Sequence, residues 1–204
     1  MMNKNEKNSI RKYDSIAHDY DSTFEGKFTA RYRQKILELC RMPSGGKVLD
    51  VGCGNGSLID EIRQRNKIEA YGIDISPKMI KECLNRYKGI HFEVSTGEEL
   101  AFGDGFFDAL TICCALHHLH NPQRFFAEAN RVLKRGGILI VGEPWNPFPI
   151  KQIMDYILSP LIRAGDNKTF TRRRLHRLFN ENGFTILQDS YEKDFMQVIK
   201  ARKI

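Results

Sequence analysis

The sequence predicts an α/β fold, a doubly wound, seven-stranded sheet that is mostly parallel, with one antiparallel strand near the C-terminus. Three observations lead to this prediction. Short apolar segments alternate with segments of helical periodicity along most of the chain, as they do in parallel α/β sheets. Glycines follow the first strand and begin a helix. The last two strands are too close in sequence for a crossover helix, so we expect them to pair antiparallel.

The predicted elements follow in order along the chain. Helices at 9–20 and 28–42 precede a strand at 47–51, a helix at 57–66, a strand at 70–75, a helix at 76–88 and strands at 90–96 and 107–115. A helix at 121–134, a strand at 137–143 and helices at 150–162 and 171–183 lead to the last two strands, 184–192 and 194–203.

Local signals mark several of these boundaries. Ser76 and Pro77 stand where an N-cap and a first helical residue are expected, because a hydroxyl accepts a free N–H and proline lacks one. Thr171 has the same place before the helix that Gly183 ends, since glycine tolerates the left-handed conformation of a C-terminal cap.

The length of 204 residues fits a single domain, 1–204. Within it we distinguish an N-terminal helical cap (1–42) and an insert after the fifth strand (143–170), which we expect to act as a lid and to contact a substrate. Apolar residues make up 41% and charged residues 28% of the chain, which excludes a disordered protein. No apolar run approaches the ~20 residues of a membrane span, and no secretory signal begins the sequence. We therefore expect a cytoplasmic protein without a membrane partner.

Charge and cysteine content narrow the classes of partner. The net charge of +7 is concentrated towards the two ends of the chain, which suits an anionic substrate, nucleic acid or a membrane surface. A solvated surface explains it equally and is our interpretation, so nucleic acid is not an expected partner. The five cysteines are odd in number and form no C-x-x-C pair, which is typical of reduced, buried thiols.

The segment VLDVGCGNGSL (48–58) carries the most functional information. Gly52, Gly54 and Gly56 lie between a strand and a helix, where glycine permits a tight turn and lets a ligand approach the backbone. Asp74 ends the next strand, and a carboxylate at that point can accept hydrogen bonds from two ribose hydroxyls. The pattern therefore predicts a ligand that contains a nucleoside, bound at the carboxyl edge of the sheet.

The glycine spacing separates two kinds of nucleoside ligand. Dinucleotide sites favour G-x-G-x-x-G, whereas this turn reads G-x-G-x-G and has Ser57 in the place of the third glycine. The departure disfavours a pyrophosphate and suits a ligand without phosphates. A nicotinamide-dependent oxidoreductase stays as an alternative, although no obvious catalytic tyrosine–lysine pair accompanies the turn.

Several segments in this order resemble class I S-adenosylmethionine-dependent methyltransferases, a Rossmann-like family, and within it the group that acts on small molecules. The segments are YDSIAHDYD (13–21), VLDVGCGNG (48–56), YGIDIS (71–76), TGEELAFGDGFFDAL (96–110), ALHHLHNP (115–122) and RVLKRGGILIV (131–141). The resemblance extends to about residue 145. It implies S-adenosyl-L-methionine as cofactor and S-adenosyl-L-homocysteine as product.

The resemblance also implies roles for single residues. Asp50 and the turn Gly52–Gly56, which includes Cys53 and Asn55, would shape the pocket for the methionine part of the cofactor. Asp74 would hold the ribose hydroxyls, and Ile75 would lie against the adenine.

Further cofactor contacts are implied after the third and fourth strands. Thr96 stands where the family often has an aspartate that binds the adenine amino group, and a hydroxyl accepts more weakly than a carboxylate. Gly97 follows, and the backbone N–H of Glu98 would meet an adenine ring nitrogen. Cys113 would lie beside the methionine tail. Tyr20 either covers the pocket or is a core tyrosine of an amphipathic helix.

Histidines after the fourth strand are the candidate catalytic groups. Methyl transfer from a sulfonium requires alignment of its reactants, and a base only when the acceptor arrives protonated. His118 matches the histidine of a Glu-His pair in quinone-pathway O-methyltransferases, and His117 has the place of the glutamate. Each histidine is either such a base or a structural residue that bonds to the backbone, and the second interpretation is favoured.

A metal site is not expected. Cys113 and Cys114 stand close to the histidines, but adjacent residues of a strand point to opposite faces, so both thiols would not reach one ion. We predict a methyltransferase that transfers a methyl group to oxygen or nitrogen of a small molecule. The alternatives are an RNA or protein methyltransferase, the nicotinamide oxidoreductase, and a cofactor-binding protein without activity.

Overall fold

The computed structural model describes residues 4–144, 170–192 and 196–204. Its helices are α1 (Lys4–Ile16), α2 (Phe24–Leu39), α3 (Ser57–Asn66), α4 (Pro77–Arg86), α5 (Pro122–Val132) and α8 (Arg172–Glu181), with 3-10 turns η1 (Tyr20–Ser22) and η2 (Leu116–His118). Its strands are β1 (Lys47–Val51), β2 (Glu69–Asp74), β3 (Ile90–Val94), β4 (Phe107–Cys113), β5 (Leu133–Pro144), β6 (Phe184–Glu192) and β7 (Met196–Lys203).

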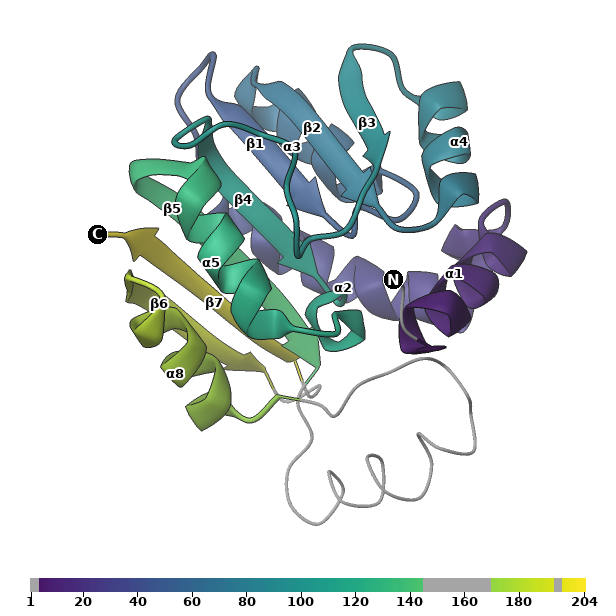
Figure 1. Cartoon of the computed structure of the whole chain (residues 1–204). Helices are drawn as coiled ribbons and strands as arrows, with labels where there is room; N and C mark the ends of the chain where they lie inside the picture. The colour runs from purple at the N-terminus through teal and green to yellow at the C-terminus, as the bar shows by residue number, and fades with distance from the viewer. Residues whose placement is uncertain (1–3, 145–169, 193–195) are drawn as a thin grey trace.

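The strands form one seven-stranded sheet in the order β3-β2-β1-β4-β5-β7-β6 (Figure 1). β1 pairs parallel with β2 and β4, and the outer pairs β2–β3 and β4–β5 are also parallel. β7 pairs antiparallel with β5 and with β6. The predicted fold class is therefore confirmed, including the single reversed strand. The first three strands are added in one direction from β1, and the chain then crosses back past β2 and β1 to form β4 on the other side. At such a reversal of strand order, a crevice lies at the carboxyl ends of the two strands, here β1 and β4.

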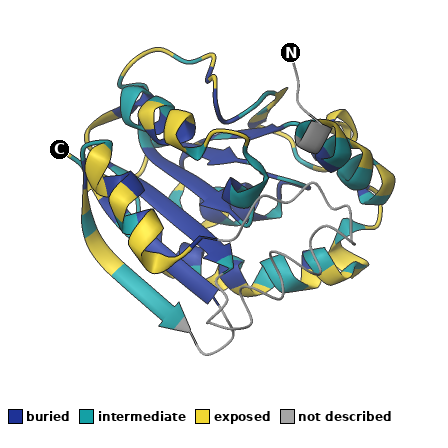
Figure 2. Cartoon of the chain, turned by 60° about the horizontal axis from the view of Figure 1, so that its bottom comes forward, coloured by how far each residue is buried: buried dark blue, intermediate teal, exposed yellow. Residues whose placement is uncertain are grey.

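Helices cover both faces of the sheet, and neighbouring strand residues point to opposite faces. Leu110 and Leu139 belong to a buried cluster that includes Phe126 of α5 and Phe179 of α8. Ala109 precedes Leu110 in β4, and Ile140 follows Leu139 in β5. Both belong to a second cluster, on the other face, with residues of α2 and α3. The central strands are buried along most of their length (Figure 2). This explains why the strands read as nearly continuous apolar runs.

The helix caps form where the sequence predicts them. The Ser76 hydroxyl accepts the N–H of Met79, and Pro77 is the first residue of α4. The Thr171 hydroxyl accepts the N–H of Arg174 at the start of α8. Gly183 follows the end of that helix with a φ of 75°, the left-handed conformation for which glycine is suited.

Several predicted boundaries are wrong, and two of them lie at strand ends. β4 ends at Cys113 and not at residue 115, because Cys114 has a φ of 52° and leaves the extended conformation. α5 ends at Val132, and β5 already begins at Leu133, four residues before the predicted start. Leu133 is fully buried and pairs with Phe107 across a register shift, so burial of this side chain outweighs the helical pattern.

The N-terminal cap consists of α1, η1 and α2, and its two helices begin five and four residues earlier than predicted, and end four and three residues earlier. α2 packs on the sheet through Tyr32 and Ile36, and a side chain at Gly142 of β5 would come within 3.1 Å of Ile36. α1 contacts α4 and η2, at the carboxyl edge of the sheet. The predicted helix 150–162, and the insert apart from residues 143, 144 and 170, lie outside the described residues. Among the described helices, none combines the length and apolar character needed to cross a membrane.

Candidate active site

The glycine turn after β1 adopts the conformation that its sequence predicts. Gly52, Gly54 and Gly56 have φ values of 66°, 52° and 78°. A Cβ at Gly52 would lie 2.4 Å from the Cβ of Ala115, whereas a Cβ at Gly54 would meet only Tyr20, at 4.0 Å. Glycine is thus needed at the first position for packing. At Gly54 the backbone faces open space, which a ligand can enter.

Asp74 closes the turn from the neighbouring strand. Its carboxylate accepts the N–H of Gly54 at 2.9 Å and the N–H of Ser76 at 2.8 Å, one on each oxygen. Burial raises the pKa of the Asp74 carboxyl, and the two backbone N–H groups oppose that rise. Since each carboxylate oxygen has a second lone pair, both oxygens can still accept a ligand hydroxyl.

Asp50 lies beneath the turn, on the face of β1 that α2 and α3 cover. The Thr111 hydroxyl of β4 donates to it at 2.7 Å. The carboxyl is almost fully buried, and this burial raises its pKa to about 7, partly offset by the Thr111 hydrogen bond and helped by the nearby charge of Asp74. Such a carboxyl group changes charge near neutral pH, so a cation arriving in the pocket would favour its ionised form.

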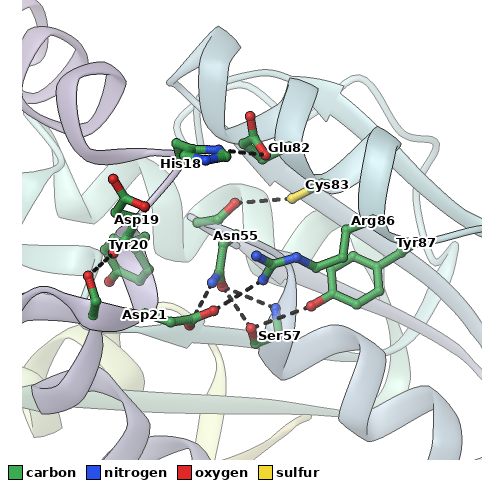
Figure 3. Close-up of polar contacts among 12 residues, drawn as sticks. His18, Asp19, Tyr20, Asp21, Asn55, Ser57, Glu82, Cys83, Arg86 and Tyr87 are labelled. Atoms are coloured by element: carbon green, nitrogen blue, oxygen red, sulfur yellow. Dashed lines mark hydrogen bonds and ion pairs between the residues drawn. The ribbon is translucent and has the colours of Figure 1, made fainter.

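The N-terminal cap holds the turn through two aspartates of the YDSIAHDYD segment. Asp14 accepts the Ser76 hydroxyl at 2.5 Å, at the N-terminus of α4. Asp21 accepts the side-chain amide of Asn55 at 2.7 Å and lies 3.1 Å from Arg86 (Figure 3). The segment therefore binds the glycine turn and α4 at once, although neither lies near it in sequence.

Tyr20 points from η1 into the same region. Its hydroxyl lies 3.2 Å from the Thr29 hydroxyl of α2 (Figure 3), and burial raises the pKa of its phenol. Gly26 supports this turn from below, because a Cβ at Gly26 would lie 2.0 Å from the Tyr20 carbonyl oxygen. The placement of Tyr20 thus requires glycine in the first turn of α2.

These elements enclose a cavity at the carboxyl ends of β1 and β4. Its empty space measures about 1090 Å³, counting the part open to solvent. The predicted site residues that line it are Tyr20, Asp50, Gly52, Cys53, Gly54, Asn55, Asp74, Ile75, Thr96, Gly97, Cys113 and His118.

Three predicted site residues do not line this cavity. A Cβ at Gly56 would contact Tyr87, Cys83 and Phe92, behind the turn. The N–H of Glu98 donates to the Thr96 hydroxyl at 3.3 Å, and its carboxylate accepts the N–H of Asn121 at the start of α5. The backbone N–H and the carboxylate of Glu98 therefore both form hydrogen bonds within the protein.

The third is His117, and its neighbour His118 differs from it sharply. His117 Nδ1 lies 2.7 Å from a carboxylate oxygen of Glu143, which is fully buried. The other oxygen of Glu143 accepts the N–H of Leu116, so this glutamate caps η2. His118 turns to the cavity, and its Nε2 lies 2.9 Å from the Tyr13 hydroxyl. Two adjacent imidazoles thus occupy different surroundings.

The strand-alternation argument is wrong for the adjacent cysteines. Cys113 ends β4, and the φ of 52° at Cys114 turns the second side chain, so both residues line the cavity. Among the described residues, no group of three or more histidine, cysteine or acidic side chains is arranged to hold a metal ion.

Some cavity residues were not found from the sequence. Gly26, Thr29 and Ser95 line the cavity, but no spacing pattern distinguishes them from ordinary helix or loop residues. Asp14 and Asp21 belong to the quoted N-terminal segment, and the repeated Tyr-Asp pair was the signal that could have identified their contacts.

Comparisons with known proteins show which proteins the chain is similar to. Residues 49–141 match a family model described as "Methyltransferase domain". The chain is 31% identical over 147 residues to the demethylmenaquinone methyltransferase of Thermotoga maritima, covering 70% of this chain and 64% of that protein. The chain thus spans a little under two thirds of that relative's length.

Solved structures share the fold. The methyltransferase bound to the Haloferax volcanii Trm112 activator superposes with a TM-score of 0.79 at 17% identity, covering 93% of this chain and 96% of that one. A SAM-dependent methyltransferase of Thermotoga maritima superposes with a TM-score of 0.73 at 21% identity, covering 96% and 100%. The cofactor of this family is S-adenosyl-L-methionine, and the residues around the glycine turn fit it. Residues 49–141 thus match a methyltransferase domain, and the fold is the one shared by S-adenosylmethionine-dependent methyltransferases of class I.

Proposed function

We propose that this protein transfers the methyl group of S-adenosyl-L-methionine to an oxygen or nitrogen atom of a small molecule. The observation that supports it is one cavity lined by Gly54, Asp74 and His118. The first two suit a nucleoside ligand, and the third is a group able to accept a proton.

The cofactor supplies an activated methyl group on a sulfonium, and the chain's residues bind and orient it. Asp74 would accept the ribose hydroxyls with the lone pairs that Gly54 and Ser76 leave available. Asp50 and the open backbone at Gly54 would take the methionine part, whose ammonium favours an ionised carboxyl group. Ile75, Thr96 and Gly97 line the wall assigned to the adenine.

His118 is the proposed base for an acceptor that arrives protonated. It lines the cavity, and its Nε2 contacts the Tyr13 hydroxyl. When the imidazole has taken a proton from the acceptor, Nε2–H can donate to the Tyr13 oxygen, which stabilises the charged ring. His117, bonded to the buried Glu143, is proposed to hold η2 in place. It acts on the reaction only through the position of its neighbour.

A carbon acceptor is the second candidate. It is favoured by the similarity to a demethylmenaquinone methyltransferase, whose name describes a quinone acceptor. A quinol hydroxyl must lose its proton to make the ring carbon nucleophilic, so His118 would have the same duty there. The two candidates therefore differ in the methylated atom and share the site.

The first experiment is calorimetric titration of the protein with S-adenosylmethionine, S-adenosylhomocysteine and NAD. We expect the two adenosyl ligands to bind and NAD to give no heat of binding. Binding of NAD alone would overturn the proposal and restore the oxidoreductase alternative.

The second experiment identifies the acceptor class. Panels of phenols, amines and demethylated naphthoquinols are incubated with cofactor labelled in its methyl group, and products are located by mass spectrometry. Label on oxygen or nitrogen supports the proposal, and label on a ring carbon supports the second candidate. Transfer only to RNA or protein would contradict both.

A further inference from the structure

Two adjacent thiols open into the same cavity, which a regular strand would prevent. Cys113 is the last residue of β4, and Cys114 has a left-handed φ of 52°. That conformation is unfavourable for a residue other than glycine, by roughly 1–2 kcal/mol, and the N–H of Cys114 is held by the Gly142 carbonyl at 2.8 Å. Both residues line the cavity and belong to one side of the sheet, because Cys113 is part of the buried cluster beneath α2 and Cys114 packs against it.

The second thiol of this pair is held in its neutral form. Burial raises the pKa of the Cys114 thiol, and the adjacent Cys113 raises it further, so the Cys114 thiol stays protonated at neutral pH. Zinc binds thiolates and takes four protein ligands in a structural site, which the described residues around this pair do not supply. The cluster around the pair is apolar and includes Tyr32 and Ile36. A neutral ligand that needs two thiols matches this surface.

We propose that Cys113 and Cys114 form a dithiol site that binds a trivalent arsenical from the cavity. An arsonous acid, R–As(OH)2, condenses with the two thiols. Two As–S bonds form, two As–O bonds break, and each thiol proton leaves with a hydroxyl group as water. The arsenic stays trivalent, so no oxidant or reductant is required. The product is uncharged, as an apolar wall demands.

The other cysteines do not offer an equivalent site. Cys53 lines the cavity, but its neighbour Cys83 is fully buried and donates to the Gly54 carbonyl at 3.2 Å. Cys40 is buried in the cluster beneath α2 and belongs to neither pair. Of the five free thiols, the arsenical should therefore bind the two that are adjacent and that both line the cavity. This inference concerns binding alone and does not depend on methyl transfer.

The test uses phenylarsine oxide, which hydrates to an arsonous acid, with the folded wild-type chain. Native mass spectrometry should show one phenylarsenic group per chain, reversed by a small dithiol. Iodoacetamide labelling after denaturation without reductant should then find Cys113 and Cys114 protected. Protection of Cys53 and Cys83 instead, or no stable adduct, would overturn the proposal.

Variants separate the dithiol from any single thiol. Cys113→Ser and Cys114→Ser should each weaken arsenical affinity by about 100-fold or more, because the second bond is no longer intramolecular. Cys40→Ser, which removes a lone buried thiol, should leave the affinity unchanged. Circular dichroism checks that each variant is folded, and the protection pattern of the wild-type chain decides the matter if a variant is not. Equal affinities for all three variants would reject the site.

Discussion

Tyr13 and His118 are joined by a 2.9 Å hydrogen bond across 105 residues of sequence. Tyr13 comes from α1 of the N-terminal cap and His118 from η2 after β4, and their rings meet edge to face at 5.4 Å. Both residues line the cavity. The cap therefore does more than cover the cavity, because it also orients the imidazole of His118.

Replacing His118 tests the proposed base. His118→Ala should lower turnover of a hydroxyl or ammonium acceptor by about 10²–10⁴-fold, the usual contribution of a general base, with cofactor affinity kept. His120→Ala is the matched control, since this exposed histidine lies two residues after the end of η2. Steady-state kinetics and calorimetry measure the two quantities. Normal turnover in a folded His118→Ala variant would remove this residue from the mechanism.

Tyr13→Phe tests the positioning role of the hydroxyl. We expect a smaller loss of kcat than for His118→Ala and a displaced pH profile, because the hydrogen bond to Nε2 affects the protonation of the imidazole. In the His118→Ala background the same change should have little further effect, as expected for coupled residues. An unchanged pH profile, or full additivity of the two losses, would show that the contact is structural only.

Asp74→Ala should weaken binding of S-adenosylmethionine and S-adenosylhomocysteine by about 1.5–3 kcal/mol, the scale of hydrogen bonds to a charged group. The control is Glu69→Ala, which removes an exposed carboxylate from the other end of β2 that pairs with Lys47. Calorimetric titration compares the two. Equal affinities would mean that the ribose hydroxyls bind elsewhere.

Gly26→Ala should displace η1 and with it Tyr20. The added Cβ would lie 2.0 Å from the Tyr20 carbonyl oxygen, and relief of such overpacking typically costs about 1–3 kcal/mol. Cofactor affinity and Tm should both fall. Gly103→Ala serves as control, because its Cβ would meet nothing within 4 Å. If both variants behaved like the wild type, the packing of α2 against η1 would be misplaced.

The pH dependence of stability should carry the signature of Asp50. Burial raises the pKa of its carboxyl from 3.8 to about 7 in the folded chain. Between these values the folded state holds a proton that the unfolded state has lost. The contribution of Asp50 to the free energy of unfolding therefore falls as pH rises, by up to about 1.4 kcal/mol per pH unit. It becomes constant above about pH 7.

Asp50→Asn removes this titration, so the variant should gain on the wild type as pH rises from about 4 to about 7. Urea unfolding at several pH values measures the difference. Asp19→Asn, which alters an exposed carboxylate, should follow the wild-type curve. A constant difference between the wild type and Asp50→Asn would contradict the raised pKa.

Much of the fold was predictable because its signals are local. Ser76 and Thr171 cap their helices through N–H groups three residues away. The glycine turn and Asp74 stand at the ends of neighbouring parallel strands. The pairing of these two strands is enough to bring them together. The strand boundaries at Cys113 and Leu133 were missed because pairing and burial with distant residues decided them.

The sequence by itself determined the order of the elements, the reversed last strand, the glycine turn and the acid that closes it. These depend on periodicity, turn chemistry and strand direction. Only the tertiary structure decided how two adjacent residues of the same type, such as His117 and His118, come to have different partners. Glu143 of β5 engages His117, while Tyr13 of α1 receives His118. A left-handed turn at Cys114 brings two thiols to one cavity. The physical reason is that such assignments depend on partners far apart in the chain, which come together only when the sheet and its cap have packed.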